Sequence, residues 1–159
     1  MTHRFFSSLA RRAAAVLGGT VLASALLGAP AAQAQNLRGL SNADGSIQCE
    51  YGDVGGTYIR CHSPGARATR TECNPPNYLV PRVQYSNGES WADCFNQGLS
   101  VTNFKKLRPG EVFQFKELAV IADLQGGLHL VSPSGYAGYV GKTAIDDASG
   151  MGKVSSRAV

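Results

Sequence analysis

No apolar run in this sequence is long enough to cross a membrane as a helix. The longest run, residues 13–27, consists almost entirely of Ala, Val, Leu, Gly and Thr. It has about fifteen residues, whereas a helix needs about twenty to span the hydrocarbon core of a bilayer. We therefore expect no membrane span in the mature protein.

Several signatures of enzymes and metal sites are also missing. Neither Gly-x-Ser-x-Gly nor His-Glu-x-x-His occurs, and only two histidines, His62 and His129, follow residue 34. The four cysteines are spaced by 12, 12 and 21 positions, so no Cys-x-x-Cys pair indicates zinc. We expect no catalytic residue, no metal and no cofactor.

The first 34 residues have the order of a secretory signal peptide. Three arginines and no acidic residue lie within the first dozen positions, the apolar run 13–27 follows, and small residues occupy positions 32 and 34. Signal peptidase accepts small residues one and three positions before the cleaved bond, which places the cut between Ala34 and Gln35. The alternative is a membrane anchor that is never cut. We expect a secreted or cell-envelope protein.

Removing the signal peptide changes what the charge means. The whole chain carries +4, but three of its fifteen basic residues and none of its eleven acidic residues lie before residue 35. Twelve basic against eleven acidic residues leave the mature chain at +1. We expect no nucleic-acid partner, because nucleic-acid-binding domains usually carry a basic stripe. The small cluster of Lys105, Lys106 and Arg108 is interpreted as a solvated turn.

All four cysteines, Cys49, Cys61, Cys73 and Cys94, belong to the mature chain. An even number of cysteines in an exported protein predicts two disulfides, for which three connectivities exist. One β-hairpin register narrows the choice, because placing Cys49 opposite Cys61 gathers apolar residues on one face and opposite charges on the other. The neighbours in this register are Ile47 with Ser63, Gln48 with His62, Glu50 with Arg60 and Tyr51 with Ile59. We therefore predict Cys49–Cys61 and, by elimination, Cys73–Cys94.

The remaining pattern predicts an all-β class, since no mature segment of eleven or more residues shows a 3.6-residue apolar period. We expect a small disulfide-bridged domain of β-hairpins and meander, either a partly open barrel or a sandwich. The expected organisation is a flexible start at 35–43, the domain at 44–145 and a disordered tail at 146–159. Residues 63–90 are expected to be loop-rich, with a short strand at 83–85.

The second half of the chain predicts a meander. Turn residues separate four short strands, expected at 111–115, 118–122, 128–132 and 136–140. The hairpin around Gly126-Gly127 repeats the plan of the first one, with Ala122 and Leu130 in the places of the two cysteines. This likeness suggests a duplicated unit whose second copy lacks the bridge.

Several short motifs resemble a family of small exported actinobacterial domains of unknown function. Asp44-Gly45-Ser46-Ile47-Gln48-Cys49, then Ile59-Arg60-Cys61, then Ala92-Asp93-Cys94 are similar to that family's Ile-x-Cys, Val-Arg-Cys and later Cys segments. Asn42-Ala43 stands where the family has Ser-Pro, and a third cysteine pair is missing near Ala122 and Leu130. The resemblance, over about residues 40–145, implies the compartment and the fold but no activity.

Aromatic residues supply the candidate binding surface. The chain has six tyrosines and one tryptophan, and aromatic rings on a β-sheet can stack on sugars or anchor a protein partner. The candidates are Tyr136, Tyr139, Tyr58 and Trp91. The stretch Gly135-Tyr136-Ala137-Gly138-Tyr139-Val140-Gly141 also resembles a strand of bacterial SH3-like modules that bind the cell wall.

The sequence thus favours a non-catalytic binding or structural module whose partner is a cell-wall polymer or another extracellular protein. An SH3-like wall binder is the narrower alternative. A small secreted hydrolase of ribonuclease type is the alternative from another class, because Glu50, Arg60 and His62 share one predicted face and could supply acid–base chemistry. A cross-strand ion pair explains Glu50 and Arg60 without any catalysis.

Overall fold

The computed structural model describes residues 36–74 and 78–146. All of these described residues belong to one compact unit. The expected signal peptide, residues 1–34, lies outside the described residues, as does the expected tail apart from Asp146. None of the described helices is long and apolar enough to cross a membrane.

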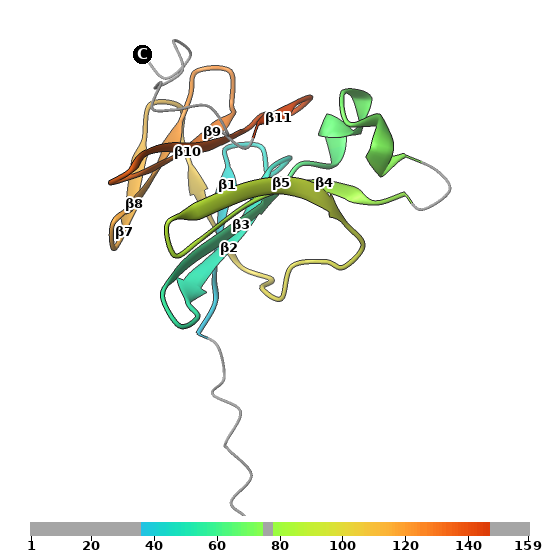
Figure 1. Cartoon of the computed structure of the whole chain (residues 1–159). Coiled ribbons are helices and arrows are strands. Elements are labelled where there is room, and N and C mark those ends of the chain that lie inside the picture. The colour runs from blue at the N-terminus through green and yellow to red at the C-terminus, as the bar shows by residue number, and fades with distance from the viewer. Residues whose placement is uncertain (1–35, 75–77, 147–159) are drawn as a thin grey trace, which may run out of the picture. The chain divides into compact units, whose positions relative to one another are not determined.

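The described residues form two β-sheets, which confirms the all-β prediction, and the sheets are not closed into a barrel. Figure 1 shows the sheet of β7–β11 packed against the sheet that contains β1–β5. The first sheet has the strand order β5-β4-β3-β2-β1-β6 and the second has the order β11-β10-β9-β8-β7. The first sheet's strands are β1 (Arg38–Asn42), β2 (Gln48–Asp53), β3 (Thr57–His62), β4 (Val80–Ser86), β5 (Glu89–Phe95) and β6 (Phe104–Leu107). The second sheet's strands are β7 (Val112–Phe115), β8 (Leu118–Ala122), β9 (Leu128–Ser132), β10 (Gly135–Val140) and β11 (Ile145–Asp146).

The hairpin of β2 and β3 has the predicted register. Cys49 lies opposite Cys61, Glu50 opposite Arg60 and Gln48 opposite His62. The Cys49–Cys61 disulfide joins the two strands inside the core, and Cys73–Cys94 forms the second bridge. Both predicted pairings are therefore confirmed.

The start of the domain corrects the expectation of a flexible segment at 35–43. Residues Arg38–Asn42 form β1, which pairs with β2 on one side and, in parallel, with β6 on the other. Leu40 is completely buried in the core, and the Asn42 amide donates a hydrogen bond to the Gly126 carbonyl oxygen at 2.8 Å. The polar composition of these residues gives no strand signal, and one of the two pairing partners, β6, lies far along the chain.

The segment expected to be loop-rich also holds more strand than expected. The short strand predicted at 83–85 is part of the longer β4, which pairs with β3 and forms a hairpin with β5. Asn87 and Gly88 make its two-residue turn with positive φ angles of 51° and 92°, as tight hairpins require. The two short 3-10 helices, η1 (Pro64–Ala68) and η2 (Thr71–Cys73), lie between β3 and β4.

The meander of the second half is confirmed, and β8 and β9 have the predicted bounds. The register of these two strands corrects the suggested duplication, however. Ala122 lies opposite Leu128, and Leu130 lies opposite Val120. Ala122 and Leu130 are therefore not cross-strand partners and do not correspond to the two cysteines of the first hairpin.

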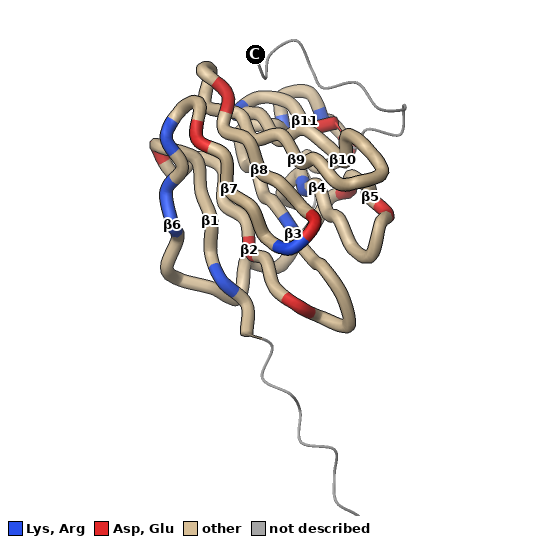
Figure 2. Tube along the Cα trace, turned by 90° about the vertical axis from the view of Figure 1, so that its left-hand side faces the viewer, with Lys and Arg blue, Asp and Glu red and all other residues tan. Residues whose placement is uncertain are grey.

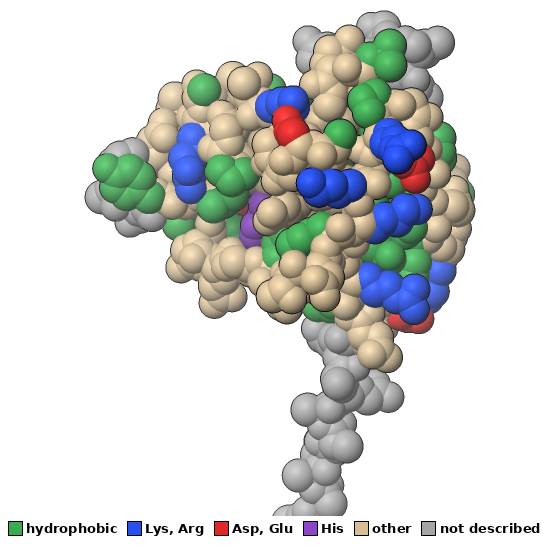
Figure 3. All heavy atoms as spheres, turned by 180° about the vertical axis from the view of Figure 1, so that it is seen from behind, with side chains coloured by type: hydrophobic (Ala, Val, Ile, Leu, Met, Phe, Trp, Pro, Cys, Tyr) green, Lys and Arg blue, Asp and Glu red, His purple; other side chains and the backbone are tan. Residues whose placement is uncertain are grey.

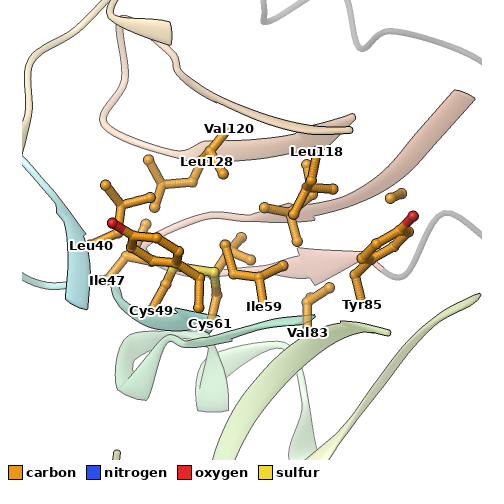
Figure 4. Packing of buried hydrophobic residues seen from close by; sticks show 14 of the residues in the cluster. Leu40, Ile47, Cys49, Ile59, Cys61, Val83, Tyr85, Leu118, Val120 and Leu128 are labelled. Carbon is orange, nitrogen blue, oxygen red and sulfur yellow. A yellow bond between two sulfur atoms is a disulfide. The ribbon is translucent and has the colours of Figure 1, made fainter. Parts of the chain in front are cut away.

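The core lies between the two sheets, where inward-facing residues of both sheets meet (Figure 4). Cys49, Cys61 and Ile59 of the first sheet point toward Leu118 and Val120 of the second. All five have relative exposures of 1% or less. Because side chains alternate along a strand, Glu50 and Arg60, which are sequence neighbours of these core residues, face away from the core. They belong to the outer face of the first sheet.

We predict that a reducing agent opens Cys73–Cys94 before Cys49–Cys61 in the native protein. Cys49 and Cys61 have no exposed surface, whereas Cys94 is only partly buried, and thiol–disulfide exchange requires access to a sulfur atom. Brief treatment with dithiothreitol, followed by alkylation and peptide mass spectrometry, should label Cys73 and Cys94 first. Earlier labelling of Cys49 and Cys61 would contradict the burial of the core bridge.

Candidate functional site

The outer face of the first sheet, which points away from the core, carries a cluster of charged side chains, a histidine and an aromatic ring. Its central residues, brought together by the registers of β2 to β5, are Glu50, Arg60, His62, Arg82, Asp93 and Phe95. The hydrolase alternative named three of these, and the structure does place Glu50, Arg60 and His62 on this one face. The ion pairs, hydrogen bonds and burial of these three side chains determine whether they can take part in acid–base chemistry.

Glu50 is buried completely and its two carboxylate oxygens are both occupied. Arg60 forms an ion pair with Oε1, and the backbone N–H of Ser100 donates to Oε2 at 2.6 Å. Ser100 belongs to the loop of residues 96–103, which connects β5 to β6. The carboxylate therefore ties this loop down over the sheet.

Phe95 lies among the cationic side chains of this face. The guanidinium carbons of Arg60 and Arg82 are 4.7 and 3.9 Å from the centre of its ring, within the range of cation–π attraction. The Arg82 Nε also donates to an Asp93 oxygen at 2.6 Å. The alternating charges and the ring form a connected layer that braces the sheet.

His62 sits at the edge of this layer, 5.7 Å from Phe95 between ring centres. It is only 6% exposed. Burial, together with the charges of Arg60 and Arg82, lowers the pKa of His62 to about 4. The imidazole is therefore neutral near pH 7, and its buried Nε2 has no hydrogen-bond partner among the described residues.

A pocket of about 470 Å³ opens beside His62, at the end of the first sheet where β2 begins and β3 ends. We call it the His62 pocket. Its described lining consists of Gly45, Ser46, Gln48, His62, Pro64, Gly65, Val80, Asn96, Gln97, Gly98 and Leu99. Neither Glu50 nor Arg60 belongs to this lining. The three residues of the hydrolase alternative thus share a face of the sheet but do not line this one concave site.

The aromatic residues expected to form one binding surface belong to two different sheets. Tyr58 lies on β3, where its hydroxyl is 3.5 Å from a Glu50 oxygen, and Trp91 lies on β5. Tyr136 and Tyr139 lie on β10 in the second sheet. The structure therefore offers a tyrosine pair rather than a four-residue surface.

The tyrosine pair is organised around His129, a buried histidine of β9. The His129 ring lies 4.8 Å from the Tyr139 ring and 5.9 Å from the Tyr136 ring, between centres. His129 Nε2 is 3.3 Å from an Asp123 oxygen. A Cβ on Gly127 would come within 2.5 Å of the Tyr139 ring, so glycine at this position leaves room for the aromatic side chain.

Sequence reasoning missed the residues that complete the outer face. Arg82 and Asp93 face each other across β4 and β5, and Ser100 enters from a loop. The opposite charges of Arg82 and Asp93 would have been a usable signal once the Asn87-Gly88 turn was taken as the centre of a hairpin. No sequence signal marks the Ser100 N–H, since any residue but proline supplies one.

Charged residues elsewhere are mixed in sign. Figure 2 shows Lys and Arg interspersed with Asp and Glu along the strands. Lys105 and Lys106 of the small basic cluster lie in strand β6 and not in a turn. Lys105 lies 3.5 Å from Glu111. Glu72 lies near the sulfurs of Cys73 and Cys94, but the disulfide leaves these sulfurs without the thiolate charge that a metal site needs.

We predict that Glu50→Ala destabilises the fold by about 3 kcal/mol, because it breaks an ion pair with a fully buried carboxylate and leaves the partly buried Arg60 charge unpaired. Urea unfolding of the variant and the parent protein measures the difference. The matched control is Asp53→Ala, which removes the partner of Lys116 in an exposed ion pair and should cost much less. Equal losses in both variants would contradict a structural role for Glu50.

We also predict that His62 makes the fold less stable as the pH falls from about 6.5 toward 4. In the folded state the pKa of His62 is lowered to about 4 from its ordinary 6.5, so only the unfolded chain takes up the proton in this range. The contribution of the neutral, buried His62 to the free energy of unfolding is complete above about pH 6.5 and declines as the pH falls toward 4. Urea midpoints across this range should fall less steeply for His62→Gln, and identical slopes would contradict the burial of a neutral imidazole.

Comparisons with known proteins identify no relative of this chain. No family model matches the sequence, no curated protein matches it, and no solved structure matches the fold.

Proposed function

We propose that this chain acts outside the cytoplasm as a non-catalytic binding module. Two disulfides that engage all four cysteines are typical of an oxidising compartment. The basic, apolar and small-residue segments before residue 35 have the order of a secretory signal. These two features support export, and the chemistry of the site supports a binding role without catalysis.

The observation that carries the proposal is the complete engagement of Glu50. A general acid or base must reach the proton that it transfers. The Glu50 side chain has no exposed surface, one oxygen binds Arg60, and the other accepts the Ser100 N–H. Its chemistry is used to hold the fold together, and a substrate has no access to it.

The hydrolase alternative loses its support for the same reason. Arg60 is held by Glu50 and packed against Phe95, so neither residue faces the His62 pocket. Of the three hydrolase candidates, only His62 lines that pocket, and no carboxylate belongs to the described lining to orient it or to share a proton. An isolated neutral imidazole is suited to hydrogen bonding with a ligand rather than to acid–base turnover.

Binding to a cell-wall polymer is the form of this proposal that can be tested first. The rings of Tyr136 and Tyr139 both lie close to the His129 ring, and both tyrosines are partly exposed. Tyrosine rings can stack on the apolar faces of sugars while their hydroxyls form hydrogen bonds. This arrangement favours the wall-binding alternative over a purely structural role.

The test is co-sedimentation of the full chain, exported by its own leader, with insoluble peptidoglycan. We expect the protein in the pellet and no soluble fragments in the supernatant by mass spectrometry. Tyr139→Ala should lower retention severalfold, whereas the control Tyr78→Ala, at a side chain 70% exposed, should not. Release of fragments that Glu50→Gln abolishes would overturn the non-catalytic proposal, and absence of retention would overturn wall binding.

A further inference from the structure

The His62 pocket is built from segments that are distant in sequence. Residues of the β1–β2 turn, the end of β3, the start of β4 and the loop after β5 contribute to one lining. In the space-filling view of Figure 3, a histidine side chain appears between hydrophobic and uncharged polar surfaces. Of the two described histidines, His129 has no exposed surface and His62 has 6%. The pocket thus lies at one end of the first sheet, beside His62.

The chemistry of the described lining is polar but uncharged. Three side-chain amides, Gln48, Asn96 and Gln97, are exposed around it and offer both donors and acceptors. Leu99 and Val80 supply apolar surface between them. No lysine, arginine, aspartate or glutamate belongs to this lining, so nothing in it would compensate a charged ligand group.

His62 adds an unsatisfied polar atom to this lining. Its Nε2 is buried and has no hydrogen-bond partner within the described part of the chain. A buried polar atom without a partner costs free energy, and a ligand hydroxyl or amide that reached this nitrogen would recover that cost. The neutral ring, whose pKa lies near 4, can either donate or accept such a bond.

We propose that the His62 pocket binds an uncharged sugar that carries an acetamido group, as found in N-acetylated amino-sugar polymers. This assignment deepens the proposed binding function and rests on it. The acetamido group presents one donor, one acceptor and a methyl group, which match the carboxamides of Gln48 and Gln97 and the apolar surface of Leu99. The hydroxyls of the same ring supply partners for His62.

The size of the pocket agrees with this class of ligand. Its volume of about 470 Å³ lies within the range of roughly 300–1,000 Å³ in which small-molecule sites are found. Phosphorylated or carboxylated sugars are disfavoured because the lining lacks a cation. An uncharged peptide presents similar groups without hydroxyl-rich rings, and it is therefore the competing ligand in the test.

The experiment records backbone amide NMR spectra of the processed protein during titration with three trisaccharides. We expect the trimer of N-acetylglucosamine to shift the signals of Gln48, Gly65 and Gly98. The trimer of glucosamine, which is cationic and lacks the acetyl group, should leave them unchanged, and cellotriose should shift them much less. Equal shifts with cellotriose would overturn the acetamido assignment, and shifts caused only by a short neutral peptide would overturn the sugar assignment.

Two variants connect the shifts to the pocket. His62→Phe replaces the imidazole with an aromatic ring that has no nitrogen atoms. It should weaken binding of the N-acetylglucosamine trimer about fivefold. Gln97→Ala alters an exposed side chain, so it should weaken binding without affecting folding. The control Gln114→Ala changes an exposed glutamine on β7 and should leave affinity unchanged. Unchanged affinity in both pocket variants would overturn the proposal.

Failure of this inference is distinguishable from failure of the proposed function. Retention on peptidoglycan that depends on Tyr139, without shifts at Gln48, Gly65 or Gly98, would overturn the pocket assignment and leave the binding function supported. Loss of both retention and shifts would overturn both.

Discussion

The register of β2 against β3 is the constraint on which the rest of the structure depends. Because side chains alternate between the two faces of a strand, placing Cys49 opposite Cys61 turns both sulfurs into the core and turns Glu50 and Arg60 outward together. A slip of one residue would bury the charged pair between the sheets and expose the sulfurs. The disulfide holds this register covalently, and both the core and the outer face are built from it.

The outer face solves the problem of a buried charge with partners from several elements. Arg60 neutralises Glu50, Ser100 donates a backbone hydrogen bond to it, and Phe95 lies close to Arg60 and Arg82. A buried carboxylate is tolerated only when it is paired and hydrogen-bonded in this way. The same hydrogen bond holds the loop of residues 96–103, part of which lines the His62 pocket. The charged residues Glu50 and Arg60 therefore hold the loop that contributes to the His62 pocket, while uncharged residues form the described lining of the pocket.

This division of roles supports the proposal of ligand binding rather than catalysis. The His62 pocket offers amides, a neutral imidazole and apolar surface, and the second sheet offers a tyrosine pair around His129. Both are chemistries that hold uncharged, hydroxyl-bearing ligands through hydrogen bonds and ring contacts. Under the proposed binding function, these two features would contact a polymer at more than one point, which would raise the overall affinity without any single tight contact.

Features that depend on neighbouring residues were determined by the sequence alone. The register of the first hairpin, the Cys49–Cys61 bridge and the bounds of β8 and β9 follow from alternation and turn residues, and Cys73–Cys94 then follows by elimination. The tertiary structure decided what depends on distant partners. β1 became a strand because β2 and β6 supply its backbone hydrogen bonds, and Glu50 lost its accessibility because Ser100 approaches from a loop 50 positions away. The four aromatic candidates were separated because their strands joined different sheets. Alternation is a local property of a strand, whereas these pairings are selected by the free energy of burying groups that the linear sequence does not place side by side.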